Sequence, residues 1–525
     1  MKLLPFSHAR SFAIGLSFGL VFAGSAAHGQ AADAADINQV RATTAKLIKL
    51  LVDQGLLTRA KAEALLKEVE VPALATVPVP VAGAAAGRAT APTTVRVPFV
   101  PEFVRKEIKD EVRAELAAQA AKEGWAAPGS VTEWVRSLRW EGDLRVRYQH
   151  DNFADDNATA VSVSDTNRTR ALALLNTSEA RHRLRVRARL GLTATIDSNW
   201  SAAVRLTTGS AADPLSSNQT LGNYGNRFTV ALDRAFVRWR SGDDYNVVAG
   251  RFGNPWFGTD LVWANDLSFD GVAAQWTPRF LGGRYRGFLT LAALPVQEVE
   301  LASADKWLFG AQIGAERPGS LDVFGAKLGL GYYKYTNMVG QLNSPGSSQF
   351  DYTAPSFAQK GNTYFNISSD VNRPLLALAA AYQLLNLTGS LDFPGAMGKR
   401  ILLSGDFVQN LGFDQDAVSA RLGTRVESKA RAYMVRAAFG DPEITRVEAW
   451  QVFAYYKHVE RDAVLDAFTD SDFRLGGTDA KGLTLGGSYG VGRNSSLLVR
   501  YLSGDSLSGA PLSVDVLQVD LNMRF

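Results

Sequence analysis

The stretch RHRLRVRARL, residues 181–190, places an arginine at every second position. Because the side chains of a β-strand point alternately to its two faces, the arginines share one face and the aliphatic residues share the other. Guanidinium groups do not pack into the dry core of a soluble sandwich, since buried charges are costly. The stretch therefore predicts a strand that lies between water and an apolar medium. The arginines, called the arginine column below, are Arg181, Arg183, Arg185, Arg187 and Arg189.

The same alternation recurs from residue 141 to the end of the chain. In the last segment, residues 517–525, apolar side chains alternate with Gln518, Asp520, Asn522 and Arg524. One such segment would also fit a half-buried strand of a soluble protein, but its repetition, with small residues on the polar faces, is typical of an outer-membrane β-barrel. A secreted β-rich protein is the alternative. Aromatic residues mark the segment ends: Trp140, Tyr148, Trp239, Trp276, Tyr332, Tyr456 and Tyr489.

The fold class predicted from this pattern is an all-β transmembrane antiparallel barrel of about 16 strands, within a range of 14 to 18. An even number is expected of a bacterial single-chain barrel, and a wall of this size encloses a water-filled lumen. The candidate strands are residues 138–149, 181–195, 199–208, 230–240, 245–252, 268–277, 284–295, 307–317, 323–336, 373–386, 399–410, 430–440, 446–458, 480–491, 495–503 and 513–525. Of the long connections, we expect one of 151–179, 209–229, 337–372 and 459–479 to fold inward.

Composition excludes several other classes of protein. The 525 residues contain no cysteine, which excludes disulfides, thiolate zinc sites and cysteine nucleophiles. No run of about 20 apolar residues is present, so a helical membrane protein is excluded. The formal net charge of +4 is too balanced for a nucleic-acid binder.

The sequence offers little for enzyme chemistry, and we predict no catalytic residue, no metal site and no cofactor. The stretch Asp470-Ser471-Asp472 begins like a calcium loop, but Lys481 occupies the twelfth position, where an EF-hand needs glutamate. The acidic stretch 151–165 is interpreted as a solvated loop rather than a weak divalent-cation site. Only three histidines follow the first 30 residues, far apart in sequence: His150, His182 and His458.

The N-terminal quarter differs from the rest of the chain. Residues 1–29 have the basic start, short apolar run and small-residue exit of a secretory signal peptide. Helical spacing of apolar residues predicts a helical hairpin over 30–71, and a Pro/Ala-rich linker follows over 72–101. Residues 102–125 predict an amphipathic or coiled-coil helix. The barrel then occupies 126–525, and the extension is expected in the periplasm.

Four motifs carry a resemblance to a known family: PEFVRKEIKDEVRAEL at 101–116, GDLRVRYQ at 142–149, GRFGNPWFGTDLVWANDLSFDGVA at 250–273 and FTDSDFRLGGTDAKG at 468–482. From about residue 36 to 525 the sequence resembles the bacterial "putative porin" family of outer-membrane proteins. The resemblance implies a signal peptide, a helical and proline-rich N-terminal region, a β-barrel and a terminal aromatic residue. It also implies that Phe525 is the signal presented to the barrel-assembly machinery.

The expected function is passive diffusion of small hydrophilic solutes or ions through a barrel in the Gram-negative outer membrane. The predicted pore-lining residues are the arginine column together with Arg145 and Arg147. They would produce a mild anion preference, unless Asp143, Glu179, Asp233 or an inward loop neutralises them. The expected partners are outer-membrane lipid and the solutes, with a homotrimer as a candidate assembly and no nucleic acid. One alternative is a structural protein that tethers the envelope to peptidoglycan or a periplasmic protein through its N-terminal helices, and another is a barrel enzyme such as a lipase or protease.

Overall fold

The structure is a computed structural model of the whole chain, and it describes residues 135, 137–159, 175–300, 302–320, 322–370 and 372–525. The predictions for 1–29, 30–71, 72–101 and 102–125 lie outside the described residues. Among the described residues, no helix is both long and apolar enough to cross a bilayer.

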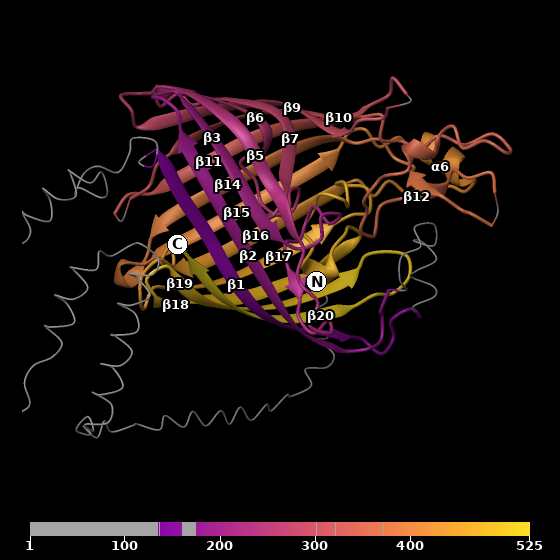
Figure 1. Cartoon of the computed structure of the whole chain (residues 1–525). Helices are drawn as coiled ribbons and strands as arrows, with labels where there is room; N and C mark the ends of the chain where they lie inside the picture. The colour runs from indigo at the N-terminus through magenta and orange to yellow at the C-terminus, as the bar shows by residue number, and fades with distance from the viewer. Residues whose placement is uncertain (1–134, 136, 160–174, 301, 321, 371) are drawn as a thin grey trace, which may run out of the picture. The chain divides into compact units, whose positions relative to one another are not determined.

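Most strands of the described chain form one antiparallel sheet that closes on itself (Figure 1). The sheet has 18 strands, of which β4 and β8 are only two residues long, so sixteen strands make up the wall. Each wall strand pairs with its neighbours in sequence, and the first, β1, also pairs with the last, β20. Closure leaves no unpaired edge in the lipid, where backbone groups have no water to bind. The predicted sixteen-stranded antiparallel barrel is therefore confirmed.

The wall strands are β1 (Leu138–Phe153), β2 (Arg181–Thr195), β3 (Trp200–Thr208), β5 (Val230–Ser241), β6 (Tyr245–Gly253), β7 (Ser268–Trp276), β9 (Tyr285–Gln297), β10 (Lys306–Arg317), β11 (Gly325–Thr336), β14 (Gln383–Pro394), β15 (Arg400–Asn410), β16 (Arg431–Gly440), β17 (Trp450–Val459), β18 (Ala480–Gly492), β19 (Ser495–Ser506) and β20 (Val514–Arg524). The shorter elements are β4 (Gln219–Thr220), β8 (Arg279–Phe280), β12 (Tyr364–Asn366), β13 (Leu376–Leu378), α6 (Gln415–Leu422) and the 3-10 turns η2 (Asp351–Thr353), η3 (Ala396–Gly398) and η4 (Phe473–Leu475).

The outer face of the wall is apolar. On β2, Leu184 and Leu190 are exposed, whereas Arg185, Arg187 and Arg189 on the opposite face are partly buried. An exposed apolar surface of this extent is stable only in contact with lipid. Six of the seven predicted aromatic residues are exposed there: Trp140, Tyr148, Trp276, Tyr332, Tyr456 and Tyr489.

One predicted strand is misplaced. The pattern predicts a strand over 373–386, but the wall strand is β14, and residues 376–378 form β13 in a separate two-stranded sheet with β12. The apolar run 375–382 is long enough to be either a wall strand or part of an extracellular connection. Its residues from Ala377 to Ala380 are fully buried, so the run fills a core that it shares with the inward loops instead of facing lipid.

The connections differ in length at the two ends of the barrel. One end has short turns, such as 196–199 and 242–244, and the C-terminal residue also lies there. The other end has the long connections, including 337–382 and 411–430, and Figure 1 shows β12 and α6 beyond the wall at that end. Outer-membrane barrels have short periplasmic turns and long extracellular loops, which assigns the two ends.

Candidate permeation pathway

Residues 254–267, which connect β6 to β7, fold into the lumen. Phe257 donates its backbone N–H to the Gln312 side chain of β10 at 2.8 Å, and its carbonyl accepts from the same amide at 2.6 Å. Thr259 donates its hydroxyl and its backbone N–H to Asp406 of β15, at 2.7 and 3.1 Å. Because this 254–267 loop contacts separate parts of the wall, it crosses the lumen. Its Trp263 is 2% exposed, which makes the loop a packed element of the interior.

A second connection, residues 460–479, also enters the lumen and packs against the first. Lys457 of β17 joins them, since its Nζ lies 3.0 Å from Asp260 of the first loop and 3.0 Å from Asp470 of the second. Ala264 donates its backbone N–H to the Phe468 carbonyl at 2.8 Å. The sequence predicted one inward connection among four candidates. In the structure the 460–479 loop enters the lumen, and so does part of 209–229, since Ser217 donates its hydroxyl to Asp266 at 2.8 Å. The 254–267 loop is a further inward connection, which sequence reasoning missed.

Carboxylates from the wall and the 254–267 loop pair with Arg187 and Arg189, the two arginines at the periplasmic end of the arginine column. Asp143 of β1 accepts from Arg187 at 2.7 Å and from Arg189 at 2.6 Å. Asp266 of the loop lies 3.2 Å from Arg187 and 3.1 Å from Arg189. Burial favours a raised pKa for Asp266, but the two guanidinium groups outweigh it and hold that pKa below its usual value. This half of the column is therefore neutralised.

Arg147 is the most enclosed of the predicted residues, at 1% exposure. It donates to Asp520 of β20 at 2.7 and 2.8 Å and to Asp472 of the 460–479 loop at 3.0 Å. Asp472 also accepts from Arg500 of β19 at 2.8 Å. Although burial alone would raise the pKa of Asp472, Arg147 and Arg500 hold it well below its ordinary value. These contacts fasten the loop to the wall.

The remaining predicted arginines differ from one another. Arg183 pairs with Asp151 across the β1–β2 ladder, and Arg181 is exposed at the start of β2. Arg145 donates to the amide oxygen of Asn218 at 2.5 Å, and Arg185 donates to Gln149 at 3.3 Å. Within the described part of the chain, neither Arg145 nor Arg185 forms an ion pair with a carboxylate.

Two polar cavities lie beside the inward loops. The larger, about 510 Å³, is lined by Arg145, Arg187, Asp266, Asp472 and Arg500 and extends to residues 442–444 of a short turn. The smaller, about 270 Å³, is lined by Thr259 and Asp260 of the 254–267 loop, Arg436 of β16 and Thr388 of β14. The larger cavity therefore reaches the periplasmic end of the barrel, and the smaller one lies between the 254–267 loop and the wall.

The other residues considered in the sequence lie outside this pathway. His150 and His182 stack at 4.2 Å next to the exposed Tyr148, and His458 stacks on the exposed Tyr433 at 5.0 Å, so all three histidines belong to the outer face. Within the described residues, no group of three or more histidines or carboxylates could hold a metal ion. Phe525 pairs with Gly142 of β1 at the closing seam.

The position of the 254–267 loop could have been predicted from the sequence. The stretch 250–273 carries a cluster of tryptophan, aspartate and glycine that does not alternate as a wall strand does. That irregularity marks the 254–267 loop. The pairing of Asp266 with the arginine column had no such signal, because it joins residues 77 and 79 positions apart.

Comparison with solved structures finds several outer-membrane proteins at low sequence identity. The high-pH structure of OprB from Pseudomonas putida shares 12% identity, with 76% of this chain and 96% of that chain covered and a TM-score of 0.44. OmpF of Salmonella typhi, in complex with daunomycin, shares 10%, with 74% and 97% covered and a TM-score of 0.40. An anion-selective porin from Comamonas acidovorans shares 12%, with 74% and 99% covered and a TM-score of 0.40. No individually curated protein matches the sequence.

The family comparison covers far more of the sequence. The family described as "Putative porin" matches residues 41–525, which include all sixteen wall strands, the inward loops and the terminal phenylalanine. The resemblance of the four sequence motifs is thereby confirmed. The chain belongs to this "Putative porin" family and is a channel-forming β-barrel of the Gram-negative outer membrane.

Proposed function

We propose that the protein passes small hydrophilic solutes and ions by diffusion along the two polar cavities, as a channel and not as an enzyme. The single observation that supports this most is the 510 Å³ cavity, whose lining is mostly polar and which reaches residues 442–444 of a periplasmic turn. Selectivity then comes from the width of the passage at the inward loops and from the charges that line it.

We further propose that the lining residues include the arginine column together with Arg145 and Arg147, acting unequally. Arg147, Arg187 and Arg189 are compensated by carboxylates, so their net field is small. Arg145 and Arg185 have only amide partners among the described residues. Arginine stays charged at physiological pH, so these two would attract anions. The expected preference for anions is about two- to five-fold.

Zero-current potentials in planar bilayers under a salt gradient test this proposal. The double variant Arg145→Gln/Arg185→Gln should move the potential toward cation preference while the channel stays open. The matched control is Arg205→Gln/Asp233→Asn, which removes both members of one ion pair and so changes no net charge. An unshifted potential in the first variant would show that Arg145 and Arg185 do not govern permeation. A wild-type protein without conductance would contradict the channel itself.

We also propose a homotrimer as the assembly. Phe525, placed at the seam that closes the barrel, would act as the assembly signal.

A further inference from the structure

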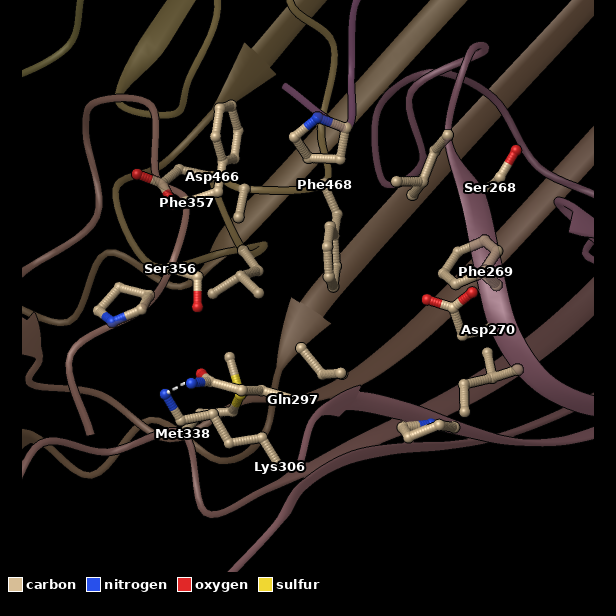
Figure 2. A pocket seen from close by; sticks show the side chains of 18 of the residues that line it. Ser268, Phe269, Asp270, Gln297, Lys306, Met338, Ser356, Phe357, Asp466 and Phe468 are labelled. Carbon is tan, nitrogen blue, oxygen red and sulfur yellow. Dashed lines mark hydrogen bonds between the residues drawn. The ribbon is translucent and has the colours of Figure 1, made fainter. Parts of the chain in front are cut away.

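A third cavity is lined by Leu267 at the end of the 254–267 loop and by residues of the extracellular loops (Figure 2). It measures about 190 Å³ and is formed where β6, β7, β9 and β10 reach the extracellular loops. Figure 2 shows Phe269 and Asp270 of β7 on one side and Gln297 and Lys306 on another. This cavity lies at the extracellular end of these strands, whereas the 510 Å³ cavity reaches a periplasmic turn.

The lining of this pocket is unlike that of a simple ion path. Phe269 and Phe468 present rings whose centroids are 6.4 Å apart at an interplanar angle of 67°. Leu294 and Met338 extend the apolar wall, and both are almost completely buried. A hydrated ion gains nothing from such a wall, whereas a flat apolar group gains by leaving water and by edge-to-face ring contacts. The wall therefore fits a solute with an aromatic ring.

Only one charged pair on the pocket lining is accessible. Arg251 Nη1 lies 2.9 Å from Asp270 Oδ2, and the two side chains are 35% and 55% exposed. The other charged groups are enclosed: Lys306 is 1% exposed and donates to Gln297 at 2.9 Å, and Asp466 is fully buried and accepts from the Tyr364 hydroxyl at 3.0 Å. The charge that meets a solute is therefore that of Arg251 or Asp270.

Arg251 is the better placed of the two. Its Nε donates to the Asp233 carbonyl at 3.0 Å, which holds the guanidinium at the pocket independently of Asp270. Asp270 is the more exposed and can turn toward water. An exposed ion pair is weak, and a guanidinium has five N–H groups arranged to bind a carboxylate in a bidentate manner. A carboxylate from solution can thus replace Asp270 on Arg251 at little cost.

We propose that this pocket binds small aromatic monocarboxylates, with the ring against Phe269 and Phe468 and the carboxylate on Arg251. The inference rests on the proposed function because the solute reaches the pocket as a permeant of the channel. It adds a recognition step on the extracellular side, which would concentrate one class of solute above the narrow part of the lumen.

Calorimetric titration of the detergent-solubilised full-length protein with benzoate tests the proposal without relying on conductance. Acetate lacks the ring, benzyl alcohol lacks the charge and benzylammonium reverses it. Benzoate should bind at least about three-fold more tightly than each of these. Conductance of the same preparation is measured separately. Benzoate binding without conductance would contradict the channel but support the pocket, and conductance without benzoate binding would overturn the pocket alone.

Variants of Arg251 and Asp270 test whether the ligand carries a negative or a positive charge. Asp270→Asn should tighten benzoate binding about two- to three-fold, because it frees Arg251, and Arg251→Gln should weaken it about three-fold or more. The matched control is Arg279→Gln, which breaks an exposed arginine–aspartate pair at the periplasmic end and should leave binding unchanged. Phe468→Ala should weaken benzoate and benzyl alcohol alike. Weaker benzoate binding in Asp270→Asn, or benzylammonium binding that depends on Asp270, would overturn the assignment.

Discussion

Phe525, the terminal residue, pairs with Gly142 of β1 through two backbone hydrogen bonds, of 2.9 and 3.0 Å. The phenyl ring lies so close to the glycine that a Cβ atom there would be 2.5 Å from the ring and 2.8 Å from the Arg189 carbonyl oxygen. Position 142 therefore has no room for a side chain while the Phe525 ring and the Arg189 carbonyl keep their present places.

Gly142→Ala should consequently weaken the seam. The added methyl group must displace the ring or the backbone, and overpacking of this kind costs about 1–3 kcal/mol. Thermal unfolding followed by the mobility of the barrel on unheated and heated gels measures the change. Gly389→Ala is the control, because its Cβ would be 3.5 Å from the nearest atom, an ordinary contact. Equal stability of the two variants would contradict the role of the close approach.

The two faces of β2 should respond oppositely to charge. Val186 lies on the apolar face beside Leu184, so Val186→Arg places a charge in the bilayer and should cost about 2–4 kcal/mol at mid-membrane. Val186→Leu is the control and should assemble like the wild type. Folding yield into lipid vesicles gives the comparison. Normal assembly of Val186→Arg together with failure of Arg185→Leu would mean that the faces are reversed.

Attachment of the 460–479 loop should depend on pH through Asp472. Its pKa in the folded protein is held well below the ordinary value by Arg147 and Arg500, which overcome the opposing effect of burial. A carboxyl group whose pKa is lower in the folded than in the unfolded protein stabilises the fold at any pH above its unfolded pKa of about 4. This stabilisation is lost as the pH falls from that value through the lower pKa of the folded protein.

Asp472→Asn should therefore lower stability at pH 7 by about 1–3 kcal/mol, and the difference from the wild type should shrink below about pH 4. Melting temperatures measured from pH 3 to pH 8 test this. Asp243→Asn, in an exposed pair, should change little at any pH. A difference that stays constant down to pH 3 would argue against the ion pairs as its cause.

Deletion of residues 30–125 should leave the conductance of the barrel intact. The predicted proline-rich linker separates the predicted hairpin over 30–71 from the rest of the chain, and the predicted helix over 102–125 ends before β1 begins at Leu138, so closure of the wall requires neither of them. If residues 104–116 form a coiled coil, the same deletion should change the oligomeric state seen on native gels. Lost conductance would show that the extension belongs to the channel, and an unchanged oligomer would leave the tethering function as the alternative for these helices.

The arginine column and the alternating segments predicted most of the wall from local sequence. The period of a strand is two residues, so the identity of Leu184, Arg185 and Val186 is enough to assign the faces. The misplaced strand at 373–386 shows the limit of this reasoning. An apolar run has the same sequence pattern whether it faces lipid or fills a core. Only the burial of Ala377 in the folded protein shows that this run fills a core.

Composition and periodicity thus determined the barrel, its strand number and its lipid-facing surface, because these depend on neighbours along the chain. The tertiary structure alone decided which charges remain in the lumen. Asp266 and Asp472 reach the arginines from loops far away in the sequence, and no local pattern specifies that approach. An electrostatic field depends on distances in space, so the sequence could count the arginines, but only the folded barrel shows which of them are neutralised.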